Sequence, residues 1–393
     1  MGPAAQTILI QTSSDQNSMP IKISHQFDAG AIEVIRAEQP DAIELNLRKD
    51  SHAEVLQWFY FRLQGARGQA CTMRLLNASQ AAFPGGWNNY QAVASYDREH
   101  WFRVPTSYDG KALTISHTPE RDSIYYAYFE PYSWERHLHL LARIEASPGA
   151  RVLDIGSTVD GRDMNVAVIG NPDADKKIWV IARQHPGETM AEWFVEGMLE
   201  ALLDRHNPHA RHLLQKAVFY VVPNMNPDGS VRGNLRTNAA GANLNREWMQ
   251  PSPERSPEVL AVRNMMHEVG CDLFLDVHGD ETLPYVFVAG CEMLEGFTGT
   301  QQAEQQAFIE SFARSSRDFQ TVHGYEASKY REEMLQLASK YIGHTFKCIS
   351  LTLEMPFKDN ADLPDPAAGW NGARSARLGA AVLQPMLDAL ERA

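Results

Sequence analysis

A change of residue pattern near residue 130 constrains the fold most. Before it, short runs of β-branched and aromatic residues are separated by turn signals such as FPGGWNN (83–89). The runs are 21–27, 42–47, 58–63, 100–104, 112–117 and 125–129. Many short strands without helical periodicity predict an antiparallel β-sandwich. We expect this domain to span residues 1–125, with the polar residues 1–18 as a disordered leader or an alternative start.

After this change, apolar strands alternate with helices. Strands are expected at 164–169, 178–183, 217–222, 272–278, 285–290 and 350–354, and helices at 188–204, 256–269, near 301–319 and after residue 372. Apolar strands buried on both faces and covered by helices predict an α/β architecture for residues 126–393. The 393-residue chain also exceeds the roughly 250–300 residues at which single cores stop growing, which favours two domains.

Composition excludes several classes of function. The formal net charge of −13 repels phosphate backbones and anionic lipids, so we expect neither nucleic acid nor membrane partners. No apolar run is long enough to span a bilayer, and the N-terminus lacks the pattern of a signal peptide. The four cysteines form no CxxC pair, which argues against a disulfide framework. We therefore expect a cytoplasmic protein.

The segment IWVIARQHPGETMAEWFVEGML (178–199) contains the strongest local signal for a metal site. His185 and Glu188 lie where a buried strand passes into a helix, and their spacing places both side chains on one side of a turn. His278 follows the apolar run DLFLDV, at the carboxyl edge where open α/β sheets place their sites. Two histidines and a glutamate with one open position are typical of catalytic zinc. We predict one Zn²⁺ per chain.

Each of these elements alone is a weak signal, because an isolated HxxE or histidine is usually structural. The other histidines serve as a comparison. His206, His209 and His212 cluster after a helix without a buried strand nearby, which favours a solvated surface. The combination of two strand ends that both carry metal-binding residues is what favours a site.

The chain resembles the zinc carboxypeptidases of the funnelin type, most closely the cytosolic carboxypeptidase-like branch. The resemblance covers about residues 125–393 and rests on five motifs in order: HPGE, NPDG…RGNLR, NLNREW, DVHGDE and LTLEMPF. The ordered set is much more specific than any single motif. It implies a mixed-sheet zinc carboxypeptidase domain, and the β-domain ahead of it is also similar to that branch.

The resemblance implies roles for matching residues. These are the zinc ligands His185, Glu188 and His278, the general base and acid Glu354, the oxyanion-stabilising Arg236, and the carboxylate-binding Asn245 and Arg246. The residue types suit the chemistry, because a guanidinium binds a planar carboxylate bidentately and a carboxylate can carry the proton of water to a leaving amine. One departure is Asn243, where many relatives have an Asp that supports a metal-bound histidine.

The expected substrates are the C-termini of peptides or proteins. The resembled branch includes enzymes that remove C-terminal glutamate, which makes a preference for acidic residues one expectation. Lys340 and Lys347 are candidates for a basic pocket, with ordinary surface positions as the alternative. Tyr330 and Tyr341 lie where relatives carry a mobile tyrosine, and neither is assigned that role.

Three other functions remain open from the sequence. The main alternative is an N-acyl amino acid amidohydrolase of the aspartoacylase type, which shares the fold and a related HxxE site. A cell-wall peptide carboxypeptidase would require export, and a binding module without zinc would not require intact metal-binding residues.

Overall fold

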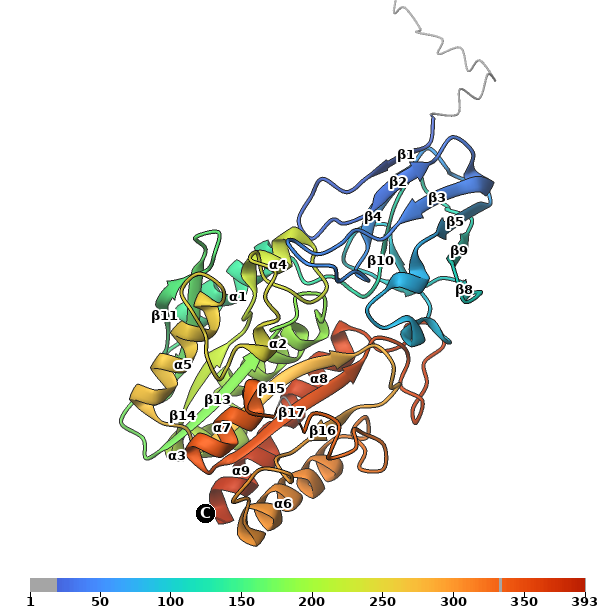
Figure 1. The fold of residues 1–393 in the computed structure, drawn as a ribbon. Helices are drawn as coiled ribbons and strands as arrows, with labels where there is room; N and C mark the ends of the chain where they lie inside the picture. Colours follow the sequence, from blue (N-terminus) through green and yellow to red (C-terminus); the bar gives the residue numbers. More distant parts are fainter. Residues whose placement is uncertain (1–19, 332–333, 393) are drawn as a thin grey trace, which may run out of the picture.

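The computed structural model describes residues 20–331 and 334–392. Figure 1 shows two domains, with the N-terminal domain lying near the carboxyl ends of the central strands of the second. The expected leader at residues 1–18 lies outside the described residues. No helix in the described part of the chain has both the length and the apolar character that crossing a bilayer requires.

The N-terminal domain consists of two five-stranded sheets. The first has the order β1-β4-β10-β6-β7, with strands β1 Lys22–Ser24, β4 Tyr60–Gln64, β6 Val93–Ser95, β7 Phe102–Arg103 and β10 Ser123–Ala127. The second has the order β2-β3-β5-β9-β8, with strands β2 Glu33–Arg36, β3 Ile43–Asn46, β5 Cys71–Leu75, β8 Thr106–Tyr108 and β9 Leu113–His117. The predicted arrangement of antiparallel strands is confirmed, except that β3 and β5 run parallel.

Alternation of side chains explains how these strands form a core. In β5, Cys71, Met73 and Leu75 are buried, whereas Thr72 and Arg74 point outward. A strand places successive side chains on opposite faces, so the apolar residues of each sheet meet between the sheets.

The second domain is built on a seven-stranded mixed sheet with the order β11-β12-β14-β13-β15-β17-β16. Its strands are β11 Ala150–Ser157, β12 Asp163–Ile169, β13 Lys176–Ala182, β14 Ala217–Val222, β15 Leu273–Asp280, β16 Phe287–Ala289 and β17 Ile349–Pro356. The four central strands β14, β13, β15 and β17 are parallel, and the outer strands pair antiparallel. The expected mixed-sheet α/β class is confirmed.

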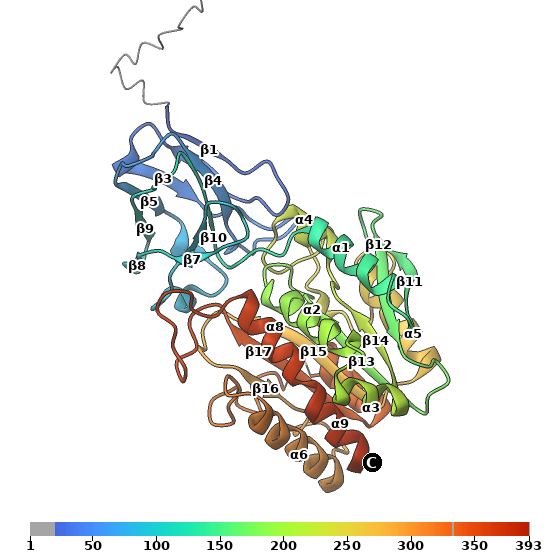
Figure 2. The same cartoon turned by 180° about the vertical axis from the view of Figure 1, so that it is seen from behind.

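Helices cover both faces of this sheet. They are α1 Trp134–Glu145, α2 Met190–Leu203, α3 Pro208–Lys216, α4 Pro227–Arg232, α5 Pro257–Val269, α6 Gly299–Ser315, α7 Ala338–Phe346, α8 Gly372–Ala381 and α9 Leu383–Arg392. Figure 1 shows α5 and α7 over one face, and Figure 2 shows α2 and α8 over the other. In β13, Ile178 and Val180 join the core under α2, while Trp179 and Ile181 join the core under α5.

Two features differ in detail from the expectations. Strand β10 crosses the expected domain border after residue 125, and all five of its residues pair with β4 of the N-terminal domain. The exact bounds of the two domains stay a prediction, and the pairing of β10 with β4 favours a border beyond β10. Strand β11 was not expected, because half of its residues are exposed and none is buried, so it lacks the apolar pattern of a buried strand.

Candidate metal centre and active site

The carboxyl ends of three parallel strands bring the predicted site residues together. His185 and Glu188 lie between the end of β13 and the start of α2, His278 lies in β15, and Glu354 lies in β17. His278 and Glu354 are direct partners in the parallel pairing of β15 with β17. Paired residues of neighbouring strands point to the same face of a sheet, so the pairing itself sets these side chains beside each other.

The turn that presents His185 is held by a buried arginine. Arg183 adopts a left-handed backbone conformation (φ 59°), and its Nε donates to the carbonyl oxygen of Pro186 at 2.9 Å. Its Nη1 pairs with Glu192 at 2.6 Å. The turn packs closely against the loop that contains Leu235, which explains the glycine at position 187. A Cβ on Gly187 would lie 3.0 Å from the carbonyl oxygen of Leu235.

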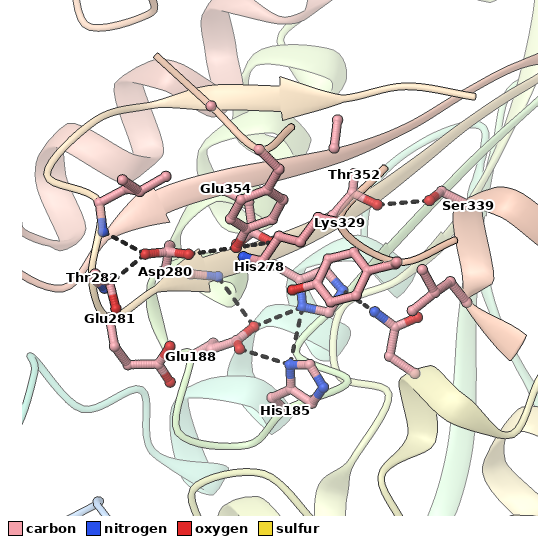
Figure 3. A pocket seen from close by; sticks show the side chains of 18 of the residues that line it. His185, Glu188, His278, Asp280, Glu281, Thr282, Lys329, Ser339, Thr352 and Glu354 are labelled. Carbon is pink, nitrogen blue, oxygen red and sulfur yellow. Dashed lines mark hydrogen bonds and ion pairs between the residues drawn. The ribbon is translucent and has the colours of Figure 1, made fainter. Parts of the chain in front are cut away.

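Glu188 bridges the two histidines (Figure 3). Its Oε1 lies 2.7 Å from Nδ1 of His185, its Oε2 lies 2.7 Å from Nδ1 of His278, and the two Nδ1 atoms are 3.2 Å apart. Donor atoms of the three buried side chains lie within 4.8 Å of one another. Within residues 20–331 and 334–392, no other such cluster of three potential ligands is found.

The outer nitrogens of both histidines are held by oxygen atoms. Nε2 of His185 lies 3.0 Å from Oδ1 of Asn243, and Nε2 of His278 lies 2.8 Å from Oδ2 of Asp276. These oxygens only accept, so each Nε2 donates its proton and each Nδ1 is the nitrogen that faces the cluster. Asn243 thus makes the hydrogen bond that an aspartate would make in relatives.

The protonation of the cluster suits a divalent cation. Burial lowers the pKa of His185 to about 3, so its ring is neutral and able to ligate. Burial opposes ionisation of Glu188, but His185 and His278 outweigh it and hold the pKa of this carboxyl well below its usual range. Two imidazoles, each held by Asn243 or Asp276, and one carboxylate form a donor set that fits catalytic zinc.

Glu354 has the environment of a proton-transfer group. It is buried, its Oε1 lies 3.2 Å from the hydroxyl of Tyr325, and its Oε2 has no hydrogen-bond partner among the described residues. Burial raises the pKa of Glu354 well above its usual range; nearby His278 acts in the opposite direction, and Glu188 raises the pKa further. A buried carboxylate oxygen without a partner is costly unless the site uses it.

The predicted substrate-binding residues line the same pocket, which has a volume of about 470 Å³. The guanidinium of Arg236 lies 5.2 Å from the ring of Phe83. Nη1 of Arg246 donates to the carbonyl oxygen of Asn245 at 3.0 Å, and its guanidinium lies 5.3 Å from the ring of Tyr330. The side-chain oxygen of Asn245 accepts from the backbone of α7 at 2.9 Å. All seven predicted residues therefore meet in one pocket.

The pocket also contains residues that the sequence did not indicate. Tyr325 and Lys329 come from a loop without a periodic pattern, and Lys329 Nζ lies 3.3 Å from the centre of the Tyr325 ring. Glu281 is buried, and its Oε1 has no hydrogen-bond partner in the part of the chain that the structure describes. The only available signal for Glu281 was its place in the DVHGDE motif. Tyr341 packs against Trp248 and does not line the pocket.

Comparisons with known proteins match both parts of the chain. The model of the cytosolic carboxypeptidase N-terminal domain matches residues 23–129, and that of the zinc carboxypeptidases matches residues 138–368. A metallo-carboxypeptidase from Burkholderia cenocepacia, solved by crystallography, is 60% identical, with a TM-score of 0.93 over 95% of this chain and 99% of that chain.

The chain covers different shares of two relatives. An uncharacterized protein of Zymomonas mobilis is 46% identical over 375 residues, which is 95% of this chain and 98% of that protein. Cytosolic carboxypeptidase 1 of Homo sapiens is 26% identical over 326 residues, which is 70% of this chain. The match covers 26% of the human protein, so the chain spans about a quarter of that relative.

Fold and site together define a metal-dependent hydrolase of peptide or protein substrates. The chain belongs to the zinc carboxypeptidase family, as the order of its sequence motifs had indicated. Its N-terminal domain is of the cytosolic carboxypeptidase type. These matches do not favour the aspartoacylase-type alternative.

We expect zinc affinity to weaken as the pH falls. Burial lowers the pKa of His278, but Asp276 and Glu188 outweigh it and raise this pKa well above its usual value. In the metal-free protein His278 therefore holds its proton more strongly than a free imidazole does, and zinc must displace that proton. The dissociation constant should rise about tenfold for each pH unit below the raised pKa. Competition with a fluorescent chelator across neutral pH measures this dissociation constant, and a pH-independent constant would contradict the expectation.

His185→Ala should abolish most zinc binding.

Proposed function

We propose that this enzyme removes C-terminal residues from peptides or proteins one at a time, with His185, Glu188 and His278 holding one zinc ion. The observation that supports this most is the convergence of that cluster with the unpartnered oxygen of Glu354 in a single pocket. When bound, zinc supplies a Lewis acid that polarises the scissile carbonyl and increases the acidity of water.

Asn245 and Arg246 would bind the terminal carboxylate of the substrate. They are neighbours in the chain and both line the pocket. The stacked ring of Tyr330 restricts the Arg246 guanidinium, and the hydrogen bond to α7 restricts the Asn245 amide. A planar guanidinium held in this way matches the geometry of a carboxylate. This assignment makes the enzyme an exopeptidase, because an internal residue has no free carboxylate.

Glu354 and Arg236 would act on the scissile bond. Oε2 of Glu354 can accept a proton from the attacking water, and the protonated carboxyl can return it to the leaving amine. Arg236 would stabilise the negative charge that develops on the carbonyl oxygen. The raised pKa of Glu354 favours the first of these proton transfers, because it makes the carboxylate a stronger base.

The pocket also supports a preference for acidic C-terminal residues. Lys340 lines it and is only 8% exposed, and within the described residues no carboxylate forms an ion pair with its ammonium group. A buried ammonium is costly without a negative partner, and an acidic substrate side chain would supply one. Lys347 is exposed at the end of α7 and does not line this pocket.

Glu354→Gln should separate catalysis from metal binding. The amide keeps the size of the side chain but cannot take a proton, so kcat should fall by at least about 10²-fold with zinc content unchanged. Glu326→Gln is the matched control, since Glu326 lies exposed on the rim of the same pocket. A Glu354→Gln enzyme with near wild-type kcat would remove Glu354 from the mechanism.

Blocking the substrate C-terminus tests the carboxylate clamp. An amidated peptide should be nearly inert, because losing a charge-assisted hydrogen bond costs roughly 1.5–3 kcal/mol, or about 10- to 150-fold in kcat/KM. Arg246→Ala should remove the preference for the free peptide. N-acetylated amino acids are the control: their turnover in place of tri- and tetrapeptides would support the amidohydrolase. Equal cleavage of free and amidated peptides would contradict the clamp.

Lys340→Met should reduce cleavage of peptides ending in glutamate by about 10- to 150-fold relative to peptides ending in glutamine. Lys347→Met is the control, because it removes the same charge outside the pocket. The measurement is kcat/KM on paired peptides that differ only in the last residue. If the glutamate-to-glutamine ratio of kcat/KM were unchanged in Lys340→Met, Lys340 would not be the residue that sets a preference for acidic C-terminal residues.

A further inference from the structure

One carboxylate of the N-terminal domain, that of Asp50, binds the backbone of the loop at residues 235–237 through hydrogen bonds. Asp50 is only 5% exposed and lies against the loop that carries Arg236. Its Oδ1 accepts from the backbone N–H of Leu235 at 2.7 Å, and its Oδ2 accepts from those of Arg236 and Thr237 at 2.7 and 2.9 Å. The Thr237 hydroxyl adds a bond at 3.2 Å. A carboxylate that receives several N–H donors fixes a loop strongly, since charge-assisted hydrogen bonds exceed neutral ones.

The loop at residues 235–237 also contacts the turn that carries His185 and Glu188. The carbonyl oxygen of Leu235 accepts from the backbone N–H of Gly187 at 2.8 Å. The loop is therefore held on one side by the N-terminal domain and on the other by the turn between His185 and Glu188. The backbone of the Arg236 loop is therefore fixed relative to the turn that carries His185 and Glu188.

Phe83 holds the other end of Arg236. Its ring lies 5.2 Å from the guanidinium, within cation–π distance, and it lines the pocket. The backbone of Phe83 is fixed in turn by Gln57, whose Oε1 accepts from its N–H at 2.9 Å and whose Nε2 donates to its carbonyl oxygen at 3.2 Å. Gln57 is fully buried in the N-terminal domain.

Within the residues that the structure describes, no carboxylate forms an ion pair with the guanidinium of Arg236, whose ring contact is with Phe83. Burial raises the pKa of the Glu281 carboxyl, and Arg236 is near enough to act on it in the opposite direction, but the two side chains do not pair. A paired carboxylate would hold the guanidinium in place, but it would also neutralise the charge that an oxyanion needs. Here the backbone and an aromatic face provide the restraint instead.

We infer that Asp50 and Phe83 are positioning residues for Arg236, and that the N-terminal domain is thereby part of the catalytic site. The inference rests on the proposed function, because it takes Arg236 as the group that stabilises the developing oxyanion. It also assigns the N-terminal domain a role beyond its own fold: a catalytic domain without it would have Arg236 but not its orientation.

The test is a double-mutant cycle between Asp50→Asn and Arg236→Ala, measured as kcat on one peptide. Arg236→Ala should lower kcat by about 10²- to 10³-fold, as loss of an oxyanion donor does. Asp50→Asn should lower it by about 10- to 100-fold, as displacement of a catalytic group does. The double variant should match Arg236→Ala alone, because Asp50 acts only through the arginine. Zinc content should stay unchanged throughout.

Phe83→Leu gives a second measurement that does not depend on the folding of Asp50→Asn, because Phe83 is only half-buried. It should lower kcat in the same way and have no effect in the Arg236→Ala background. Arg103→Gln is the matched control: Arg103 donates to the carbonyl oxygens of Phe357 and Trp370 at 3.0 and 2.9 Å, so it joins the domains away from Arg236. It should lower the melting temperature and leave kcat unchanged.

Several outcomes would overturn the inference. If Asp50→Asn lowered kcat by the same factor with and without Arg236, or if Arg103→Gln lowered it as much, Asp50 would only support the fold. An unaffected kcat in Asp50→Asn or in Phe83→Leu would overturn this inference alone. Full kcat in Arg236→Ala would overturn it together with the role proposed for Arg236. Preference for free over amidated C-termini in the wild type reports separately on the carboxypeptidase activity.

Discussion

The parallel pairing of β15 with β17 is the constraint on which the rest of the site depends. It sets His278 directly opposite Glu354, although the two residues are far apart in the chain. A shift of the register by one residue would turn one of these side chains to the other face of the sheet. The neighbouring strand β13 ends at the same edge and delivers His185 and Glu188. Backbone hydrogen bonds thus determine how far the metal cluster lies from the carboxylate that would move protons.

Around this framework the pocket collects more buried negative charge than the chain balances. Burial raises the pKa of Glu281 and Glu354 well above the usual range, with Glu188 adding to both shifts. A divalent cation at the histidine cluster would act in the opposite direction on both carboxyls, because it adds positive charge at short range. The polar partners of the cluster, Asn243 and Asp276, hold the ligands in place for that cation. The buried carboxylates and the two histidines therefore form a local environment that favours a divalent cation.

Strongly apolar strands were predictable, and irregular or exposed segments were not. The expected strand at 217–222 coincides with β14, and that at 164–169 lies within β12, because runs buried on both faces carry a continuous apolar signal. The exposed edge strand β11 and the loop with Tyr325 and Lys329 carry no such signal. The expected border at residue 125 falls inside β10, since a change of pattern locates a domain boundary only to within several residues.

The sequence by itself determined the types of the residues proposed to bind zinc, their placement at strand ends, and the order of motifs that identifies the family. These follow from local spacing and from apolar runs, which are properties of short segments. Only the tertiary structure decided that Lys340 lines the pocket while Lys347 does not, and that Asp50 and Phe83 reach Arg236 from another domain. Such contacts join residues distant in the chain, and their geometry depends on how the two domains pack, which no local pattern records.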